Sequence, residues 1–423
     1  MGRNHQRGGH EASLARSVER KPNTGTRYDS RRKDQVGEGG VRDIGNSKVV
    51  HEREGLPHFS EKLRCNGSAT VAFLGGSITE GFGASDPDRT SWRALTERYF
   101  TEKYPDVRWT FVNAGVGGTN SSLGAHRLRS HVPLADGIDL LLVEFAVNDS
   151  QHRDRSEEGR AETLRGMEGI VRQCRTGSPM ADIAFLYSAS KDNLAETDPF
   201  SISVHEEVAK HYGIPSVSFW REARDWLDAG NGQWEELAPD GVHPNDAGYA
   251  LYAKALFGFL EHALGGSETT EREANYSECN PLAPLREDNY EFAAMLDATN
   301  VYDLLDVKWS DKPEPLVNWR YDAKHLAAEE AGAEFSFEVY GRGAGLLLLC
   351  GPDTGIFEFS VNGGEYRAHN PFDEWCPLFN RPVMISLVSQ TNEENLRINV
   401  RNTPLKDERS TGYTLRMLGI LRH

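Results

Sequence analysis

The stretch that most constrains the fold is a run of nine residues from Ile138 to Ala146, with the sequence Ile-Asp-Leu-Leu-Leu-Val-Glu-Phe-Ala. The run is nearly continuous in apolar residues. A strand with that pattern is buried on both faces, as central strands of a parallel sheet are. Parallel sheets occur in proteins that alternate strands with helices, so the flanking sequence should show that alternation.

Strand and helix patterns do alternate from Ala69 to Leu264. Four further short apolar stretches predict strands at 71–74, 107–112, 183–187 and 216–219. Helices are predicted at 92–104, 157–175, 199–212 and 246–264, the first capped by Thr90-Ser91 and the last stopped by Gly265-Gly266. We therefore expect residues 49–266 to form a three-layer α/β/α domain around a five-stranded parallel sheet.

Beyond about residue 330 the apolar pattern changes to a period of two. Short strands without intervening helices are predicted at 334–340, 345–350, 356–361, 383–388, 396–400 and 413–421. Residues 330–423 are therefore expected to form an antiparallel β-sandwich of the jelly-roll kind, joined to the first domain by a linker and packing segment at 267–329. Residues 1–48 have almost no large apolar side chains and are expected to be disordered.

Charge and cysteine content narrow the class of function. The 423 residues carry a formal net charge of −17, and nucleic acids and anionic membranes both bind basic faces, so neither is expected as a partner. No apolar run approaches membrane-spanning length and no secretory signal is evident, which predicts a soluble, cytoplasmic protein. Five scattered cysteines without a CxxC pair predict reduced thiols. The sequence contains no clustered His or Cys motif, so neither a metal nor another cofactor is expected.

The first predicted strand ends abruptly in Gly75-Gly76-Ser77. Ligands of open α/β sheets bind at the carboxyl ends of strands, and a serine on a glycine-relieved turn there is a candidate nucleophile. A helix N-cap is an equally good interpretation of this stretch alone. A nucleotide-binding turn is excluded, because neither Gly-Lys-Ser/Thr nor Gly-x-Gly-x-x-Gly follows the strand.

A nucleophilic serine needs a base, and one candidate stands just before the last helix of the first domain. In the segment 239–245, Pro-Asp-Gly-Val-His-Pro-Asn, Asp240 precedes His243 by three residues. In a tight loop that carboxylate can turn onto one ring nitrogen and leave the other facing the serine. An ordinary polar turn that caps the next helix explains the segment as well.

Acyl transfer also requires hydrogen-bond donors for the oxyanion that develops on the substrate. Gly118, in a glycine-rich block after the second strand, could offer a backbone N–H. Asn148, in Ala146-Val147-Asn148-Asp149 after the third strand, could offer a side-chain amide. Taken singly, a glycine turn and an Asx turn explain these two stretches better.

Taken together, the stretches resemble the four blocks of the SGNH, or GDSL-type, hydrolases. The resemblance covers residues 68–264 and rests on Gly75-Gly76-Ser77-Ile78-Thr79, Gly118, Asn148, and Asp240 with His243. It implies a flavodoxin-like fold in which Ser77 is the nucleophile, His243 the base and Asp240 its orienting partner. It also implies an oxyanion hole made of the N–H groups of Ser77 and Gly118 and the side chain of Asn148.

Two residues depart from the family pattern. Gly76 stands where the family usually has Asp, and Ala146 where Gly is usual. Neither is assigned a proton-transfer or oxyanion role, so activity is expected to survive, while both flank the pocket and bear on which ester it accepts.

The second domain resembles the jelly-roll modules beside some carbohydrate esterases, which favours a small acylated saccharide, acetylated in particular, as the substrate. Its exposed faces could include Trp309, Trp319 and Trp375 as platforms for sugar rings, or these aromatics could simply pack the sandwich. Two rival functions are kept open. One is a general short-chain carboxylesterase, thioesterase or lysophospholipase-like enzyme, and the other is a carbohydrate-binding protein on an inactive hydrolase fold.

Overall fold

The computed structural model describes residues 48–65, 67–151, 155–265 and 282–423. The predicted disorder of residues 1–48 lies outside these ranges except for Lys48. Residues 267–281 of the predicted linker and packing segment, which include Cys279, also lie outside them. The other four cysteines are free thiols. None of the helices in the described ranges is both long enough and apolar enough to cross a membrane.

The first domain is built on a six-stranded sheet with the order β1-β6-β5-β4-β2-β3. Its strands are β1 (Val50–His51), β2 (Ser68–Gly75), β3 (Arg108–Gly115), β4 (Leu140–Glu144), β5 (Asp182–Leu186) and β6 (Ser216–Val217). Strands β2 to β6 pair in parallel, and their order is that of flavodoxin-like sheets. The expected five-stranded sheet is thus extended by β1, which pairs antiparallel with β6 and is too short to give a periodic signal.

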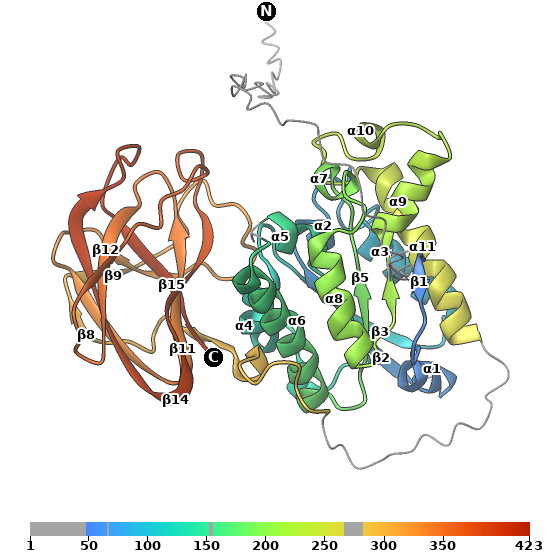
Figure 1. Ribbon diagram of the computed structural model, residues 1–423, viewed down its shortest axis with the longest axis horizontal. Coiled ribbons are helices and arrows are strands. Elements are labelled where there is room, and N and C mark those ends of the chain that lie inside the picture. Colours follow the sequence, from blue (N-terminus) through green and yellow to red (C-terminus); the bar gives the residue numbers. More distant parts are fainter. Residues whose placement is uncertain (1–47, 66, 152–154, 266–281) are drawn as a thin grey trace, which may run out of the picture. The chain divides into compact units, whose positions relative to one another are not determined.

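Helices cover both faces of this sheet (Figure 1). Helices α4, α6 and α8 contact one another on one face, and α1, α3, α9 and α11 pack together on the other. The helices of the domain are α1 (Pro57–Arg64), α2 (Ser77–Glu80), α3 (Trp92–Lys103), α4 (Ser121–His131), α5 (Ala146–Gln151), α6 (Glu157–Gly177), α7 (Lys191–Leu194), α8 (Phe200–His211), α9 (Phe219–Asp228), α10 (Trp234–Leu237) and α11 (Asp246–Gly265), with a 3-10 turn at Leu134–Asp136.

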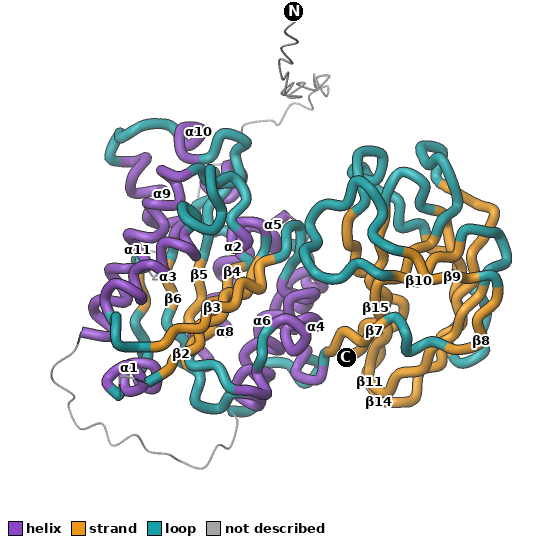
Figure 2. The backbone as a smooth tube through the Cα atoms, turned by 180° about the vertical axis from the view of Figure 1, so that it is seen from behind, coloured by secondary structure: helices purple, strands orange, loops and turns teal. Residues whose placement is uncertain are grey.

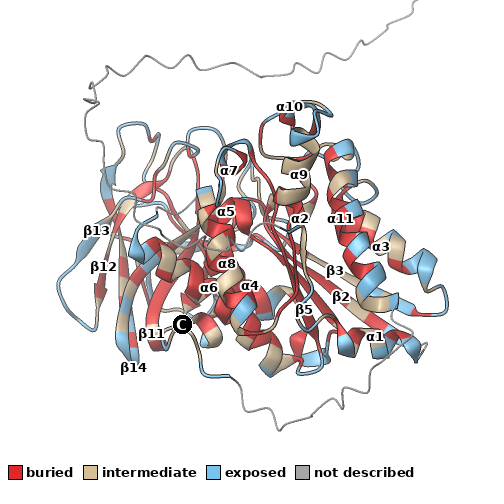
Figure 3. Ribbon diagram, turned by 45° about the vertical axis from the view of Figure 1, so that its right-hand side comes forward, coloured by how far each residue is buried: buried red, intermediate tan, exposed pale blue. Residues whose placement is uncertain are grey.

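The four predicted helices correspond to α3, α6, α8 and α11, and local chemistry sets their ends. Ser91 caps α3 by accepting from the N–H of Ala94, and Ser156 caps α6 by accepting from that of Gly159. The expected strand at 216–219 is shorter, because Ser218 caps α9 and the helix begins at Phe219. Strand β4, the run that opened the sequence argument, is buried throughout, and Figure 3 shows burial concentrated on the sheet and the helix sides that face it.

The second domain consists of nine antiparallel strands joined by loops (Figure 2). They are β7 (Ala294–Asp297), β8 (Tyr302–Leu305), β9 (Val307–Ser310), β10 (His325–Ala328), β11 (Glu334–Cys350), β12 (Gly355–Val361), β13 (Arg367–His369), β14 (Arg381–Lys406) and β15 (Leu415–Arg422). A 3-10 turn at Tyr290–Phe292 precedes them. Asn362 and Gly363 both have positive φ, as the hairpin turn between β12 and β13 requires.

Two expectations for this domain need correction. Strands β7 to β10 lie before residue 330, inside the segment expected to be linker, because four-residue strands carry too little alternation to be recognised. The strands expected at 334–340 and 345–350 form one strand, β11, with register shifts near Gly341 and Gly345, and the two expected between 383 and 400 both lie in β14. Helix α4 meets this domain through an apolar cluster of Leu123, Leu347, Leu349, Leu418 and Leu421.

Candidate active site

Ser77 lies where strand β2 gives way to the short helix α2. Gly76 is the N-cap residue of α2 and Ser77 is its first residue, so the N-cap interpretation of Ser77 is wrong. A Cβ at Gly75 would lie 2.2 Å from Thr79 Oγ1 and 2.5 Å from the carbonyl oxygen of Glu144, which is why only glycine fits there. The Tyr249 hydroxyl and the Trp92 ring N–H both donate to the carbonyl of Ile78 and hold α2 from two sides.

The Asp240–His243 loop brings its two side chains into line with Ser77. Ser77 Oγ is 2.8 Å from His243 Nε2, and His243 Nδ1 is 2.7 Å from Asp240 Oδ2. Asp240 Oδ1 accepts from the backbone N–H groups of Val242 and His243. Partial burial acts to raise the pKa of Asp240, but these hydrogen bonds and that from the His243 ring outweigh it and hold the pKa below its usual value.

The loop is anchored at both ends. Gly241 has a positive φ of 82°, and its carbonyl accepts from the Trp234 ring N–H and the backbone N–H of Lys191. On the other side, Asn245 Oδ1 accepts from the N–H groups of Ala247 and Gly248 at the start of α11, while its amide donates to the carbonyl of Glu236. His243 is therefore held by backbone contacts rather than by side-chain packing alone.

The two predicted oxyanion donors lie beside the serine turn. Asn148 is in α5, 5% exposed, and its amide packs so closely on Gly76 that a Cβ there would be 2.0 Å from Asn148 Oδ1. Gly118 follows β3 with a positive φ of 68°. Its block is tied to the serine turn because the N–H of Val116 donates to the carbonyl of Gly75.

Phe82 is a neighbour of His243 that sequence reasoning missed. Its ring is 4.5 Å from the His243 ring, centre to centre, in an edge-to-face arrangement, and 59% of the residue is exposed. The carbonyl of Phe82 accepts from the Tyr249 hydroxyl, which fixes the turn that presents it. An exposed aromatic at a tight turn could have been suspected from the Gly-Phe-Gly sequence at 81–83. In the structure, Gly81 and Gly83 both have positive φ.

Beneath this edge of the sheet lies a buried carboxyl group, Glu144. It accepts hydrogen bonds from the hydroxyls of Ser188 and Thr79. Burial raises its pKa to about 7, and the two hydrogen bonds act in the opposite direction. The charge of Glu144 therefore changes near neutral pH, and its partner Thr79 lies two residues after Ser77 in the sequence.

The three tryptophans predicted as sugar platforms lie in different places. Trp319 belongs to the segment between β9 and β10 and packs against His131 and Tyr321, and its neighbour Asn318 lies beside Gly118. Trp375, 49% exposed, stacks on Phe379 in the loop before β14. Trp309 is on β9, where Lys324 lies over its ring.

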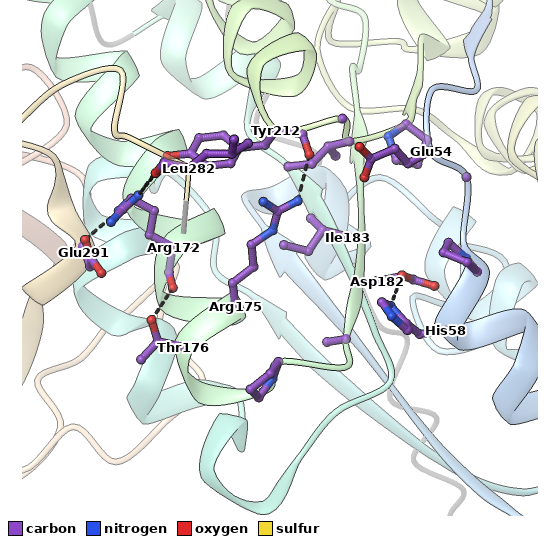
Figure 4. Close-up of a pocket in the computed structure, with 17 residues that line it drawn as sticks. Glu54, His58, Arg172, Arg175, Thr176, Asp182, Ile183, Tyr212, Leu282 and Glu291 are labelled. Atoms are coloured by element: carbon purple, nitrogen blue, oxygen red, sulfur yellow. Dashed lines mark hydrogen bonds and ion pairs between the residues drawn. The ribbon is translucent and has the colours of Figure 1, made fainter. Parts of the chain in front are cut away.

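A cavity of about 530 Å³ lies apart from this site, at the start of β5 (Figure 4). Several of its polar side chains are paired: Arg172 with Glu291, His58 with Asp182, and Arg175 with the carbonyl of Tyr212. The cavity lies at the edge of the sheet where β5 begins. Ser77 follows the carboxyl end of the parallel strand β2, at the opposite edge, so the cavity is not the site of the candidate nucleophile. Among the described residues, no cluster of His, Cys, Asp and Glu is placed to hold a metal ion.

Solved structures described as two-domain esterases share this arrangement over 88% of the chain. A two-domain esterase active on acetylated mannans has 23% sequence identity with this chain and a TM-score of 0.72, covering 88% of this chain and 96% of its own. The same kind of esterase co-crystallised with mannopentaose has 22% identity, the same TM-score and the same coverage. An acetylxylan esterase from Geobacillus stearothermophilus has 20% identity and a TM-score of 0.37, covering 47% of this chain and 94% of its own.

A comparison with curated protein sequences gave no significant match. A family model does match, and the match spans residues 73–251, which include every predicted residue of the serine relay and the oxyanion hole. The class of enzyme predicted from the sequence, a carboxylic ester hydrolase, is that of the matched family. Residues 73–251 of this chain match the model of the GDSL-like lipase/acylhydrolase family.

Proposed function

We propose that the chain is a serine esterase that removes short acyl groups, acetyl in particular, from a carbohydrate by way of an acyl-enzyme. The observation that carries the proposal is the continuous relay from Ser77 Oγ to His243 Nε2 at 2.8 Å and from His243 Nδ1 to Asp240 Oδ2 at 2.7 Å. This is the arrangement by which a weakly nucleophilic hydroxyl is activated.

In the first half of the reaction, Ser77 Oγ attacks the acyl carbon while its proton passes to His243 Nε2. The carbonyl π electrons move onto oxygen, where the N–H groups of Ser77 and Gly118 and the Asn148 amide donate to the negative charge. Collapse of this intermediate breaks the bond to the alcohol, which takes the proton from His243. Asp240, ionised because its pKa is depressed, orients the imidazole and stabilises its charged form.

In the second half, water replaces the alcohol. His243 takes a proton from the water as its oxygen attacks the acyl carbon on Ser77. The second tetrahedral intermediate expels Ser77 Oγ, which regains its proton from His243, and the carboxylic acid leaves. No cofactor is needed, because every proton moves through His243.

The proposal of a saccharide substrate has its own support. The solved esterases that share both domains with this chain are described as active on acetylated mannans. Asn318, from the second domain, lies beside Gly118, and the exposed ring of Phe82 lies beside His243. Aromatic faces bind the apolar faces of sugar rings, and amides bind their hydroxyls.

The test is release of acetate from acetylated manno- and xylo-oligosaccharides, with Ser77→Ala as the control. Wild type should release acetate and Ser77→Ala should not. A parallel series of p-nitrophenyl esters should peak at acetyl. A peak at octanoyl or longer would instead support a lipid-directed enzyme, and oligosaccharide binding without turnover would support a binding protein.

A further inference from the structure

Arg127, on α4, is a fully buried cation beneath the candidate active site. Its guanidinium donates to backbone carbonyls: Nη1 to Ala114 O at 2.7 Å and Nη2 to Gly75 O at 2.8 Å. Nη2 is also 3.3 Å from Thr119 Oγ1. Burying a charge is costly unless hydrogen bonds compensate, so a cation held in this way points to a role beyond packing.

The acceptors of Arg127 lie in the two turns that must act together on a substrate. Gly75 ends the strand that leads to Ser77, and Ala114 lies near the end of the strand that leads to Gly118. Thr119 directly follows Gly118, and its hydroxyl donates to the carbonyl of Val116. A guanidinium is planar and rigid, so its two terminal nitrogens, bound to Ala114 O and Gly75 O, set the distance between the serine turn and the Gly118 turn.

A second side chain, that of Glu80, also holds the Gly118 turn. Glu80, three residues after Ser77 on α2, accepts from the N–H of Gly117 at 2.8 Å. Arg127 and Glu80 also attract each other electrostatically. Both neighbours of Gly118 in the sequence are therefore held by charged side chains. Glu80 binds the N–H of Gly117, and Arg127 binds the hydroxyl of Thr119.

The Arg127 guanidinium is positively charged at neutral pH. Burial lowers its pKa, to about 10, which remains well above neutral pH. Burial together with the charges of Arg127 and Arg320 lowers the pKa of the neighbouring His131 to about 3, so that this histidine is neutral. Arg127 therefore contributes a positive charge beside the Gly75 and Gly118 turns.

We propose that Arg127 is a positioning residue that holds the Gly118 N–H in register with Ser77 and thereby preorganises the oxyanion hole. This inference rests on the proposed esterase function. It requires that loss of the Arg127 guanidinium weaken binding of the tetrahedral intermediate more than binding of the ester substrate.

The test compares Arg127→Gln, Arg127→Lys and the control Arg172→Gln, each in the full chain. Arg172 is also a largely buried arginine with three hydrogen-bond partners, but it lies at the cavity at the start of β5. The measurements are kcat and KM for p-nitrophenyl acetate, and inhibition by 1,1,1-trifluoroacetone. This ketone forms a bond from its carbonyl carbon to Ser77 Oγ, the π electrons pass to oxygen, and the serine proton passes to His243.

For Arg127→Gln we expect kcat to fall by about 10²-fold with KM changed less than about threefold, the size of effect of losing an oxyanion donor. Affinity for trifluoroacetone should fall in parallel. Arg127→Lys, which keeps the charge but cannot bridge both carbonyls, should lose about tenfold in kcat. Arg172→Gln should lower the melting temperature and leave both kinetic quantities unchanged.

The inference is overturned if folded Arg127→Gln keeps kcat and trifluoroacetone affinity within about twofold of wild type, while Ser77→Ala is inactive. If Arg127→Gln does not accumulate as folded protein, the same result for Arg127→Lys overturns it. Equal activity of wild type and Ser77→Ala would instead overturn the proposed function, so the two failures are distinguishable.

Discussion

Replacing Gly76 by alanine should disable the candidate active site by displacing Asn148. The ideal Cβ would lie 2.0 Å from Asn148 Oδ1 and 2.9 Å from its Cγ. Side-chain carbons do not approach other heavy atoms closer than about 3 Å, so the amide must move by about 1 Å or more. A shift of that size in a group that positions reacting atoms can cost about 10²-fold in rate.

The backbone itself does not resist this substitution. Gly76 has φ −87° and ψ −152°, which any residue can adopt, so the expected loss comes from the side-chain clash alone. Aspartate, the residue usual in the family at this position, should meet the same obstacle. Gly67→Ala is the matched control, since a Cβ there meets nothing within 4 Å.

The assay is kcat for p-nitrophenyl acetate, normalised to serine reactive with a fluorophosphonate, together with a double-mutant cycle. Gly76→Ala should lower kcat by about 10²-fold, and Asn148→Ala by about 10²–10³-fold. If both act through the same amide, adding Gly76→Ala to Asn148→Ala should cost little more. A kcat for Gly76→Ala within threefold of wild type, or additive losses in the cycle, would refute the reasoning.

Three further predictions concern neighbouring groups. Asp240→Asn should lower kcat by about 10³–10⁴-fold with the fold intact, because His243 loses its orienting partner; unchanged kcat would remove Asp240 from the mechanism. Phe82→Ala should raise KM for acetylated oligosaccharides several-fold and leave kcat for p-nitrophenyl acetate within about twofold, whereas equal effects on both substrates would deny it a role in sugar binding. Because the pKa of Glu144 is raised, to about 7, in the folded state, the protein should lose stability as pH rises from 5 to 8. Urea titration should show this loss, on the order of 2–3 kcal/mol, and its absence in Glu144→Gln; identical pH profiles would contradict the assignment.

Most of the first sheet could be predicted because its inner strands β2, β4 and β5 are almost entirely buried and therefore read as short continuous apolar runs. Helix α4 could not, because its sequence is polar. Its buried face includes His126 and Arg127, and Gly124 packs directly on the ring of Phe145. A helix that buries hydrogen-bonded polar groups has no apolar stripe to recognise.

The residues of the candidate site also fall into those that the sequence predicts and those that only the structure shows. The serine, glycine, asparagine and Asp-x-x-His stand in sequence blocks and could be found from their order. Glu80, Phe82 and Arg127 stand in no block, and their importance depends on contacts between segments far apart in the chain. The sequence showed that Gly76 departs from the family pattern at a position flanking the pocket. The structure shows why a larger residue does not fit there, because a Cβ would clash with Asn148.

The contacts of Asn245 affect the temperature at which the enzyme loses activity. Asn245 closes the loop that carries His243 and also caps the first turn of α11. Helix ends open locally at far lower cost than the whole protein unfolds. When the first turn of α11 frays, the imidazole leaves its place although the sheet is still intact. Activity should therefore disappear at a lower temperature than the far-ultraviolet signal of the helices, and it should return at once on cooling.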